Sequence, residues 1–392
     1  MGDLLQKLKE MKKLVLLIIS ISVTNYIMAQ NNRDEVVKRI DQLLEEELKK
    51  ENVHNAYLSI YSPSKDFEWH SAKGKFKDGT DVTINNPFYT ASVGKTFTAT
   101  AIGMLVDLGK IKFGDPITKY LSDETMDSVH ILNGVDYRDS IRLSHLLQHT
   151  SGLPDYFDNN TLDGSPSMFD LIMFEPDRFW QPEELISFSK AHFTPSFAPG
   201  TSYYYTDTEY VLLGMIIENV SGMKFHQFLE KNILNPHEMN QTYLNQRSEA
   251  KQPTSRMAEM YASEYEISTY KSLSADWAGG AIVSTGNDLI KFQEALMSGE
   301  LVSEETLEMM QQWTKETKGM EYGYGLRRIT FQELDDELPD WEVIGHSGLN
   351  GTSMYYCPDL DVYIAGTLNQ LEASKDAVKL MIKIILTLSM TN

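Results

Sequence analysis

The chain has 392 residues, 42% of them hydrophobic, and a formal net charge of −21 at pH 7. This length suits one large domain or two ordinary ones, and the acidic balance argues against nucleic acid and anionic membrane surfaces, which attract basic patches. The single cysteine, Cys357, excludes an internal disulfide and a cysteine-rich zinc site, and we expect no metal and no other cofactor.

Residues 1–29 have the pattern of a signal peptide. Two basic residues, Lys12 and Lys13, precede an apolar run at residues 14–23, and Ala29 marks a plausible cleavage site. The run is too short to span a bilayer, and Met11 is the expected natural start. We therefore predict an exported protein, periplasmic or secreted, without stable membrane insertion after cleavage. A retained N-terminal anchor is the alternative.

The remaining residues, 30–392, are expected to form a single domain. Apolar periodicity predicts strands at residues 55–62, 67–76, 322–329, 341–345, 352–357 and 362–368. It predicts helices at residues 31–51, 96–109, 141–148, 206–222, 225–233, 288–296 and 374–388. Strands near both ends around a helical middle indicate an α+β fold, with one antiparallel sheet built from both chain ends and flanked by helices. We expect the α/β part at about 30–125 and 276–392, and an inserted mostly helical part at about 126–275.

A Ser-x-x-Lys tetrad, Ser92 to Lys95, opens the helix predicted at residues 96–109. The chain contains six such tetrads, but this one alone is followed by a buried apolar stripe that begins at Phe97. Helical spacing brings the Lys95 amine within reach of the Ser92 hydroxyl, and a partly desolvated lysine can take a serine proton. The helix start offers backbone N–H groups to an oxyanion. The alternative is an ordinary helix cap.

A Ser–Lys pair also needs a proton relay to the leaving group, and Tyr205 is the candidate. It lies on a loop directly before the helix at residues 206–222, which starts with a Thr206–Glu209 capping box. From there a phenol can hydrogen-bond both Lys95 and Ser92. Asp207, in the first helical turn, is a position that favours a carboxylate anyway. An aromatic cluster that simply packs, and the tripeptide starting at Tyr243, are the alternatives.

The third element is His346-Ser347-Gly348, at the end of the strand predicted to begin at Trp341. Glycine lets a substrate backbone approach closely, and such a strand edge can align a substrate and donate a second oxyanion N–H. A surface histidine in a glycine-rich turn is the alternative.

These three elements, in this order, resemble the serine β-lactamase and penicillin-binding protein superfamily. Within that superfamily, the resemblance is strongest to the branch of class C β-lactamases, D-alanyl-D-alanine carboxypeptidases and esterases. Flanking stretches at residues 146–153, 199–200 and 279–288 agree in position. The resemblance implies Ser92 as the acylated nucleophile, Lys95 as its base and Tyr205 as the residue that shares or relays the proton. It implies an oxyanion hole from the N–H groups of Ser92 and Leu349, and substrate contacts at Asp207, His346, Ser347 and Gly348. The substrate would be a small-molecule or short-peptide acyl compound.

Two positions depart from the family pattern. Asp207 stands where the family has asparagine, and if it reaches the cleft it would hold Lys95 in its charged form, a poorer base. His346 stands where β-lactamases have a lysine that grips the penicillin carboxylate, and a neutral imidazole attracts that anion less. We therefore predict an exported serine hydrolase for esters or amides, of the esterase, D-amino-acid peptidase or D-Ala-D-Ala carboxypeptidase type, with weak or no β-lactamase activity.

Other functions remain open at this point. His145 and His149 have a spacing that can hold zinc, although no glutamate follows His145 as in metalloproteases. A true class C-like β-lactamase and a non-catalytic penicillin-binding sensor share the fold, and fold does not fix function.

Overall fold

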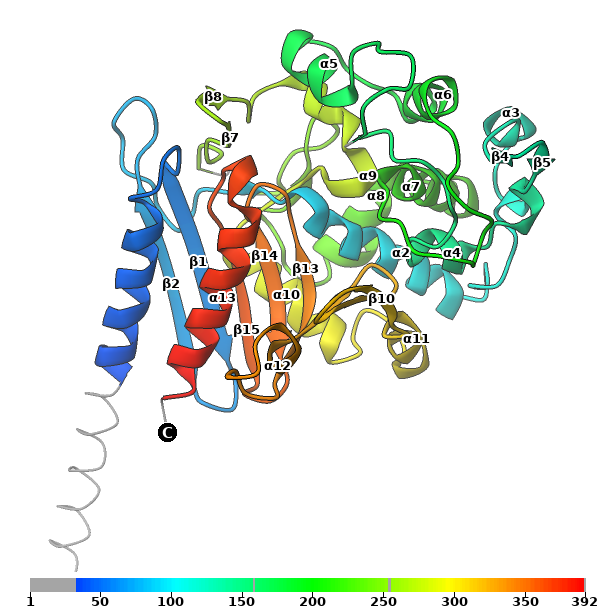
Figure 1. The fold of residues 1–392 in the computed structure, drawn as a ribbon. Coiled ribbons are helices and arrows are strands. Elements are labelled where there is room, and N and C mark those ends of the chain that lie inside the picture. Colours follow the sequence, from blue (N-terminus) through cyan, green and yellow to red (C-terminus); the bar gives the residue numbers. More distant parts are fainter. Residues whose placement is uncertain (1–32, 158, 253–254, 391–392) are drawn as a thin grey trace, which may run out of the picture.

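A computed structural model describes residues 33–157, 159–252 and 255–390. The predicted signal peptide lies outside these residues. The centre of the fold is an eight-stranded antiparallel sheet in the order β10-β11-β12-β13-β14-β15-β1-β2 (Figure 1). Its strands are β1 Asn55–Ser62, β2 Phe67–Gly74, β10 Thr314–Thr317, β11 Met320–Tyr322, β12 Arg327–Thr330, β13 Glu342–Ser347, β14 Ser353–Cys357 and β15 Val362–Thr367.

The two ends of the chain meet in this sheet, which confirms the predicted α+β architecture. Strand β1 pairs antiparallel with β15, with Tyr57 opposite Thr367. The strand predicted at 322–329 is wrong in its middle, because the chain turns between β11 and β12. Gly325 adopts a positive φ of 67° there, and a Cβ at this position would meet Ala99 at 2.3 Å.

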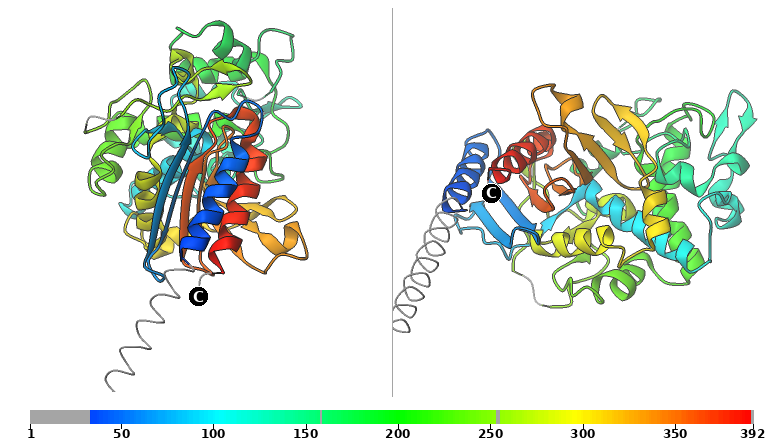
Figure 2. Two further views of the ribbon diagram at one scale, coloured as in Figure 1. Left: turned by 90° about the vertical axis from the view of Figure 1, so that its left-hand side faces the viewer. Right: turned by 90° about the horizontal axis from the view of Figure 1, so that it is seen from below.

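Helices cover both faces of the sheet. The helix at residues 33–47 and α13, Ser374–Leu388, lie side by side on one face (Figure 2). Their apolar residues pack with alternate residues of β1 such as Leu58, whereas Tyr57 faces the larger core on the opposite side. That core contains α2 Gly94–Asp107 and α10 Gly286–Met297.

The inserted region is mostly helical, as predicted. Its helices, with those directly before and after it, are α3 Asp123–Met126, α4 Leu143–Leu147, α5 Met168–Phe174, α6 Pro182–His192, α7 Asp207–Ser221, α8 Phe225–Leu229, a π-helical turn Glu230–Leu234 and α9 Trp277–Gly280. Two more short helices, α11 Glu304–Met310 and α12 Phe331–Leu334, belong to the C-terminal part of the chain. Single 3₁₀ turns occupy Ala91–Val93, Ile117–Lys119, Arg138–Ser140, Lys271–Ala275 and Leu371–Ala373. A three-stranded sheet has β9 Ile282–Ser284 in the middle, between β3 Phe88–Tyr89 and β6 Tyr243–Leu244. Two strand pairs are β4 Ile131–Leu132 with β5 Val135–Asp136, and β7 Tyr261–Ala262 with β8 Tyr265–Glu266.

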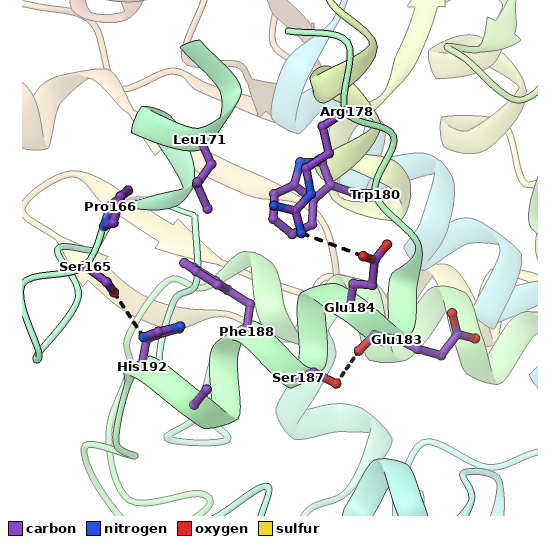
Figure 3. Close-up of a pocket in the computed structure, with 11 residues that line it drawn as sticks. Ser165, Pro166, Leu171, Arg178, Trp180, Glu183, Glu184, Ser187, Phe188 and His192 are labelled. Atoms are coloured by element: carbon purple, nitrogen blue, oxygen red, sulfur yellow. Dashed lines mark hydrogen bonds and ion pairs between the residues drawn. The ribbon is translucent and has the colours of Figure 1, made fainter. Parts of the chain in front are cut away.

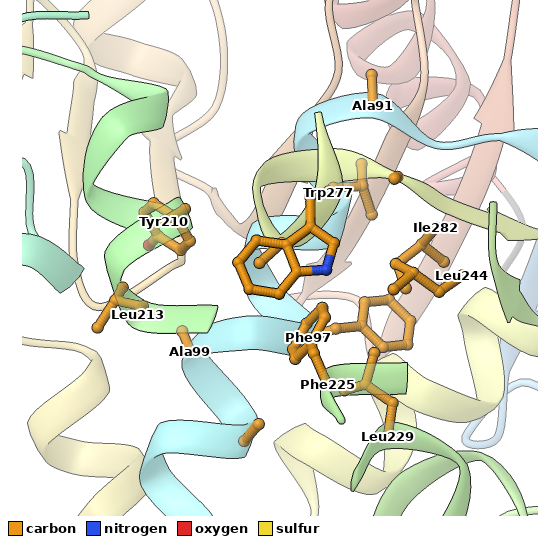
Figure 4. Packing of buried hydrophobic residues seen from close by; sticks show 14 of the residues in the cluster. Ala91, Phe97, Ala99, Tyr210, Leu213, Phe225, Leu229, Leu244, Trp277 and Ile282 are labelled. Carbon is orange, nitrogen blue, oxygen red and sulfur yellow. The ribbon is translucent and has the colours of Figure 1, made fainter. Parts of the chain in front are cut away.

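Helix α2 runs through the middle of the larger core and is buried over most of its length. Phe97 stacks on Phe292 of α10 with ring centroids 3.7 Å apart, and Trp277 and Phe225 lie beside it (Figure 4). This packing fixes the start of α2, directly after the turn that contains Ser92. Within the described residues, no helix is both long and apolar enough to cross a membrane.

Candidate active site

Ser92 lies on a tight turn between β3 and α2. Ala91 has a positive φ of 47°, a strained conformation for a residue with a Cβ, and Ser92 follows it in a 3₁₀ turn. Gly94 at the start of α2 packs on Gly280, where a Cβ would come within 2.8 Å of the Gly280 Cα. The turn directs the partly exposed Ser92 and the buried Lys95 toward each other, and the Lys95 Nζ donates a hydrogen bond to the Ser92 Oγ at 3.1 Å.

Lys95 has three hydrogen-bond acceptors, which match the three protons of an ammonium group. Besides Ser92 Oγ, its Nζ donates to the Asp207 carboxylate and to the Gly279 carbonyl at 2.9 Å. Burial acts to lower the pKa of Lys95, but the Asp207 carboxylate overrides it, and the pKa lies above its ordinary value. Asp207 therefore does reach the site, and it stabilises the charged lysine, as the sequence led us to expect.

The fold brings two tyrosines to Lys95: Tyr205, and Tyr210, whose ring centre lies 5.5 Å from the Lys95 Nζ and whose hydroxyl bonds the Leu147 carbonyl. The Nζ of Lys95 lies 5.0 Å from the centre of the Tyr205 ring, whereas Tyr243 lies on β6 and hydrogen-bonds the Met257 sulfur. Burial raises the pKa of Tyr205, and the nearby Lys95 only partly opposes this, so the phenol keeps its proton at neutral pH. The aromatic packing also exists, since the Tyr205 ring lies 4.2 Å from that of His149.

His346 is a buried residue beside Tyr205. Its side chain is fully buried; the ring Nδ1 bonds the Ser347 carbonyl at 2.9 Å, and Nε2 pairs with the Tyr322 hydroxyl at 2.8 Å. Burial and the charge of Arg327 hold the pKa of His346 well below its usual range. The imidazole is thus neutral, as expected, and the ring is buried and is not among the residues that line the pocket containing Ser92.

The residues after His346 close the site beside Ser92. Ser347 Oγ accepts a hydrogen bond from Arg327 at 3.0 Å. A Cβ at Gly348 would lie 2.6 Å from the Thr90 carbonyl oxygen, so the close approach that requires glycine is made by the chain's own backbone. Leu349 is 41% exposed and lines the same pocket as Ser92. In the part of the chain that the structure describes, the N–H groups of Ser92 and Leu349 have no protein acceptor.

The pocket at Ser92 has a polar end and apolar walls. Ser92, Tyr205, Asp207 and Asp276 form the polar end. The walls are formed by Tyr89, Ala91, Phe157, Phe169, Ile172, Met260, Ile267, Leu273, Leu349 and Leu371. The segments at residues 155–200 and 240–275 contribute six of these ten wall residues.

Sequence reasoning missed two charged groups of the site. Asp276 precedes α9 and accepts a hydrogen bond from the Tyr89 hydroxyl at 3.0 Å. Arg327 on β12 forms two hydrogen bonds to the Glu316 carboxylate, at 2.6 and 2.7 Å. Since each of these contacts joins residues distant in sequence or in different strands, no local pattern marks them.

Glu209 has a different role from the one predicted. Thr206 caps α7 through the Thr208 N–H at 3.1 Å, but Glu209 does not complete the capping box. Its carboxylate instead bonds the Nδ1 of His149 at 2.5 Å and the Ser151 N–H at 3.2 Å. Both side chains are fully buried, and the ring of His149 packs against the ring of Tyr205.

The two histidines of the zinc alternative have separate partners. While His149 binds Glu209, the Nδ1 of His145 accepts the Arg142 N–H at 3.2 Å. Among the described residues, no group of three or more His, Cys, Asp or Glu side chains is arranged to hold a metal ion.

A second hollow lies between α5 and α6, on the helical part (Figure 3). Arg178 stacks on the ring of Trp180 at 3.5 Å there, and Glu184 lies 3.7 Å from Arg178. None of the residues assigned to the site at Ser92 lines this hollow, so we place the candidate chemistry at the first pocket.

Known proteins resemble this chain in sequence and in fold. The family model described as Beta-lactamase matches residues 40–388. Penicillin-binding protein 4* of Bacillus subtilis (strain 168) is 25% identical over 342 residues, which are 82% of this chain and 67% of that protein. A D-stereospecific amidohydrolase from Streptomyces sp. superimposes with a TM-score of 0.72 at 25% identity, over 87% of this chain and 96% of its own. D-amino acid amidase from Ochrobactrum anthropi SV3, complexed with D-phenylalanine, superimposes with a TM-score of 0.75 at 22% identity, over 91% and 99% of the two chains.

Proposed function

This chain belongs to the beta-lactamase family and is a serine hydrolase, and from that premise we propose that it cleaves esters or amides of uncharged or amine-bearing acyl groups through an acyl-enzyme on Ser92. The contact that carries the proposal is the hydrogen bond from Lys95 Nζ to Ser92 Oγ at 3.1 Å, at the mouth of an apolar pocket.

The proposed reaction begins with the unprotonated fraction of Lys95. As the Ser92 Oγ bonds to the substrate's carbonyl carbon, its proton passes to the Lys95 Nζ. The carbonyl oxygen becomes an oxyanion, which the N–H groups of Ser92 and Leu349 stabilise. Collapse of this intermediate breaks the bond to the leaving amine or alcohol, which receives the proton of Lys95 through the Tyr205 hydroxyl. Water then attacks the carbonyl carbon of the acyl-enzyme, and its proton passes through the Tyr205 hydroxyl to Lys95. The bond to the Ser92 Oγ breaks, and Lys95 returns a proton to Ser92.

The charges around Ser92 support a substrate without an essential carboxylate. Lys95 is paired with Asp207, and Arg327 is paired with Glu316. His346 is uncharged because burial and Arg327 hold its pKa well below the usual range. A penicillin or a peptide ending in D-Ala-D-Ala would have to displace one of these carboxylates to bind its own. We therefore propose weak or no β-lactamase activity.

The apolar walls and the amidohydrolase relatives add weight to an amidase or esterase. The pocket walls suit an apolar acyl side chain, and a protein of 25% identity is a D-stereospecific amidohydrolase. The basic and apolar pattern of residues 1–29 supports export to the periplasm or the medium.

A substrate panel tests the proposal. It contains p-nitrophenyl butyrate, phenylalanine p-nitroanilide of both configurations, a D-Ala-D-Ala peptide and nitrocefin. Wild type should turn over the first two classes, Ser92→Ala should lose all turnover, and Ser187→Ala should keep it. Ser187 is a matched control because it belongs to another Ser-x-x-Lys tetrad, on the exposed face of α6.

Three outcomes would overturn the proposal. Nitrocefin as the best substrate would make the protein a true β-lactamase. Labelling of Ser92 by a fluorescent penicillin without turnover of any substrate would make it a sensor. Activity that EDTA abolishes and Ser92→Ala does not would indicate a metal hydrolase.

A further inference from the structure

Tyr205 lies in a segment that has no regular secondary structure, so individual contacts must hold it in place. Residues 203–206 belong to no helix or strand. One residue, His149, contacts the backbone on both sides of Tyr205. The Tyr204 N–H donates to the His149 carbonyl at 2.9 Å, and the Thr206 N–H donates to the His149 Nδ1 at 3.3 Å. His149 therefore fixes the main chain directly before and directly after the tyrosine.

The ring of His149 also restrains the side chain of Tyr205. The two ring centres lie 4.2 Å apart, and the rings are inclined by 42°. The rings of Tyr322 and Tyr210 lie 4.5 and 5.4 Å from the same imidazole, and His149 is fully buried. Because a buried side chain among close-packed neighbours has little freedom to move, the imidazole gives the phenol a rigid surface to pack against.

Glu209 holds the imidazole in its orientation. The Glu209 Oε1 accepts the Ser151 N–H at 3.2 Å, and its Oε2 bonds the His149 Nδ1 at 2.5 Å. Since that Nδ1 accepts the Thr206 N–H, the proton between the two side chains belongs to the carboxyl group. Burial raises the pKa of Glu209 well above its ordinary value, and burial with the charge of Lys95 holds the pKa of His149 well below its usual range. The pair is thus uncharged, as a fixed support requires.

The proposed reaction gives the position of this phenol a specific consequence. Tyr205 passes the proton of Lys95 to the leaving group, and a proton donor must lie within hydrogen-bond reach of its acceptor. A misplacement of about 1 Å can cost about 100-fold in rate. An alkyl alcohol needs this proton in order to leave, whereas p-nitrophenol leaves as a stable anion. The position of Tyr205 should therefore matter most for alkyl esters.

We propose that His149 is a positioning residue, which holds the hydroxyl of Tyr205 where it protonates the leaving group. This inference rests on the proposed function, because it assigns a role in the same reaction. In that step the Ser92 Oγ has bonded to the acyl carbon, and the bond from this carbon to the leaving oxygen breaks. The proton that Lys95 took from Ser92 passes through the Tyr205 hydroxyl to the leaving oxygen.

Two esters with the same acyl group test the inference, p-nitrophenyl and ethyl 3-phenylpropionate. Their kcat/KM values report the acylation step, in which the leaving group departs. His149 has a positive φ of 59°, which asparagine tolerates well. His149→Asn removes the ring that contacts Tyr205 and keeps an oxygen that can accept the Thr206 N–H. We expect its kcat/KM to fall about tenfold more for the ethyl ester than for the p-nitrophenyl ester.

A double-variant cycle tests whether His149 acts through Tyr205. Tyr205→Phe should itself lower kcat/KM most for the ethyl ester. In that background His149→Asn should no longer change the ratio of the two kcat/KM values, because residues that act through one another are non-additive. His237→Gln is the matched control. It replaces a partly buried histidine that is paired with Glu300 at 3.8 Å and does not line the pocket, and it should change neither ester.

Thermal unfolding shows whether each variant is folded. If His149→Asn does not unfold cooperatively, His149→Gln takes its place in the same comparison, with the same expected change in the ratio. An equal fall for both esters in the folded variant would show a role in the fold only and overturn the inference. The same extra loss in the Tyr205→Phe background would also overturn it, because His149 would then act by another route.

The remaining outcomes separate this inference from the proposed function. A wild-type protein that hydrolyses the p-nitrophenyl ester and not the ethyl ester delivers no proton to the leaving group, which would refute the inference. If Ser92→Ala then abolished the hydrolysis, the proposed function would still stand. Hydrolysis that survives Ser92→Ala would refute both.

Discussion

The carboxylate of Asp207 is expected to set the pH at which the enzyme becomes active. It hydrogen-bonds the Lys95 Nζ and raises the pKa of that amine against the opposing effect of burial. A lysine must be unprotonated to take the Ser92 proton. The wild-type kcat/KM should therefore rise as the pH becomes alkaline, with the ascending limb reporting Lys95.

Asp207→Asn removes this charge and keeps the size of the side chain. Two unit charges about 4 Å apart interact by about 4 kcal/mol at an effective dielectric constant of about 20, which corresponds to a displacement of about three pH units. The sign is fixed: loss of the anion lowers the pKa of Lys95, so the ascending limb moves to lower pH. The rate near neutral pH should increase for substrates that lack an ammonium group.

The assay is the pH dependence of kcat/KM with p-nitrophenyl 3-phenylpropionate, which has no group that titrates between pH 5 and 10. This choice separates the effect on Lys95 from any effect on the binding of an amine-bearing substrate. Thermal unfolding of both proteins shows whether the variant is folded. An ascending limb that stays at the wild-type pH in a folded Asp207→Asn protein would refute the reasoning that Lys95 is the base and that Asp207 controls it.

Three further predictions concern other residues of the site. Lys95→Ala should cost nearly as much in kcat as Ser92→Ala, and the double variant little more, because residues that act as one unit are non-additive; a Lys95→Ala enzyme with most of its activity would contradict this. Glu316→Gln should leave Arg327 without its carboxylate partner and lower the KM of nitrocefin by roughly tenfold while the KM of p-nitrophenyl butyrate stays the same; equal effects on both would contradict it. Because burial lowers the pKa of His346, unfolding takes up a proton there below about pH 6.5 and stability falls by about 1.4 kcal/mol per pH unit for this group. Urea denaturation of His346→Gln between pH 7 and 5 should show a shallower fall than wild type, and an identical slope would contradict it.

The fold could be predicted from the sequence where periodic patterns are long and local. The closing helix, Ser374–Leu388, has the predicted bounds, because its apolar residues repeat with the helical period. The short edge strand Thr314–Thr317 was missed, because its exposed, polar residues carry no alternating pattern. The predicted strand at 322–329 failed because this segment contains the end of β11, a glycine turn and most of β12.

The site could be predicted as far as it depends on spacing along the chain. The spacing predicts the contact between Ser92 and Lys95, whereas it left open whether Asp207 reaches Lys95, which it does. The burial of His346 could not be foreseen, since it depends on Tyr322 in another strand. The same holds for Asp276, whose approach to Asp207 depends on the packing of α9 against α7 and on the absence of a side chain at Gly279.

The most direct test of the account is the mass of the protein during turnover. Wild type is quenched in acid while it hydrolyses p-nitrophenyl butyrate, and intact-mass spectrometry is followed by peptide mapping. We expect a population heavier by one butyryl group, with the added mass on the peptide that contains Ser92, and no such population in Ser92→Ala. Continued hydrolysis with the acyl group on another residue, or hydrolysis that persists in Ser92→Ala, would contradict it.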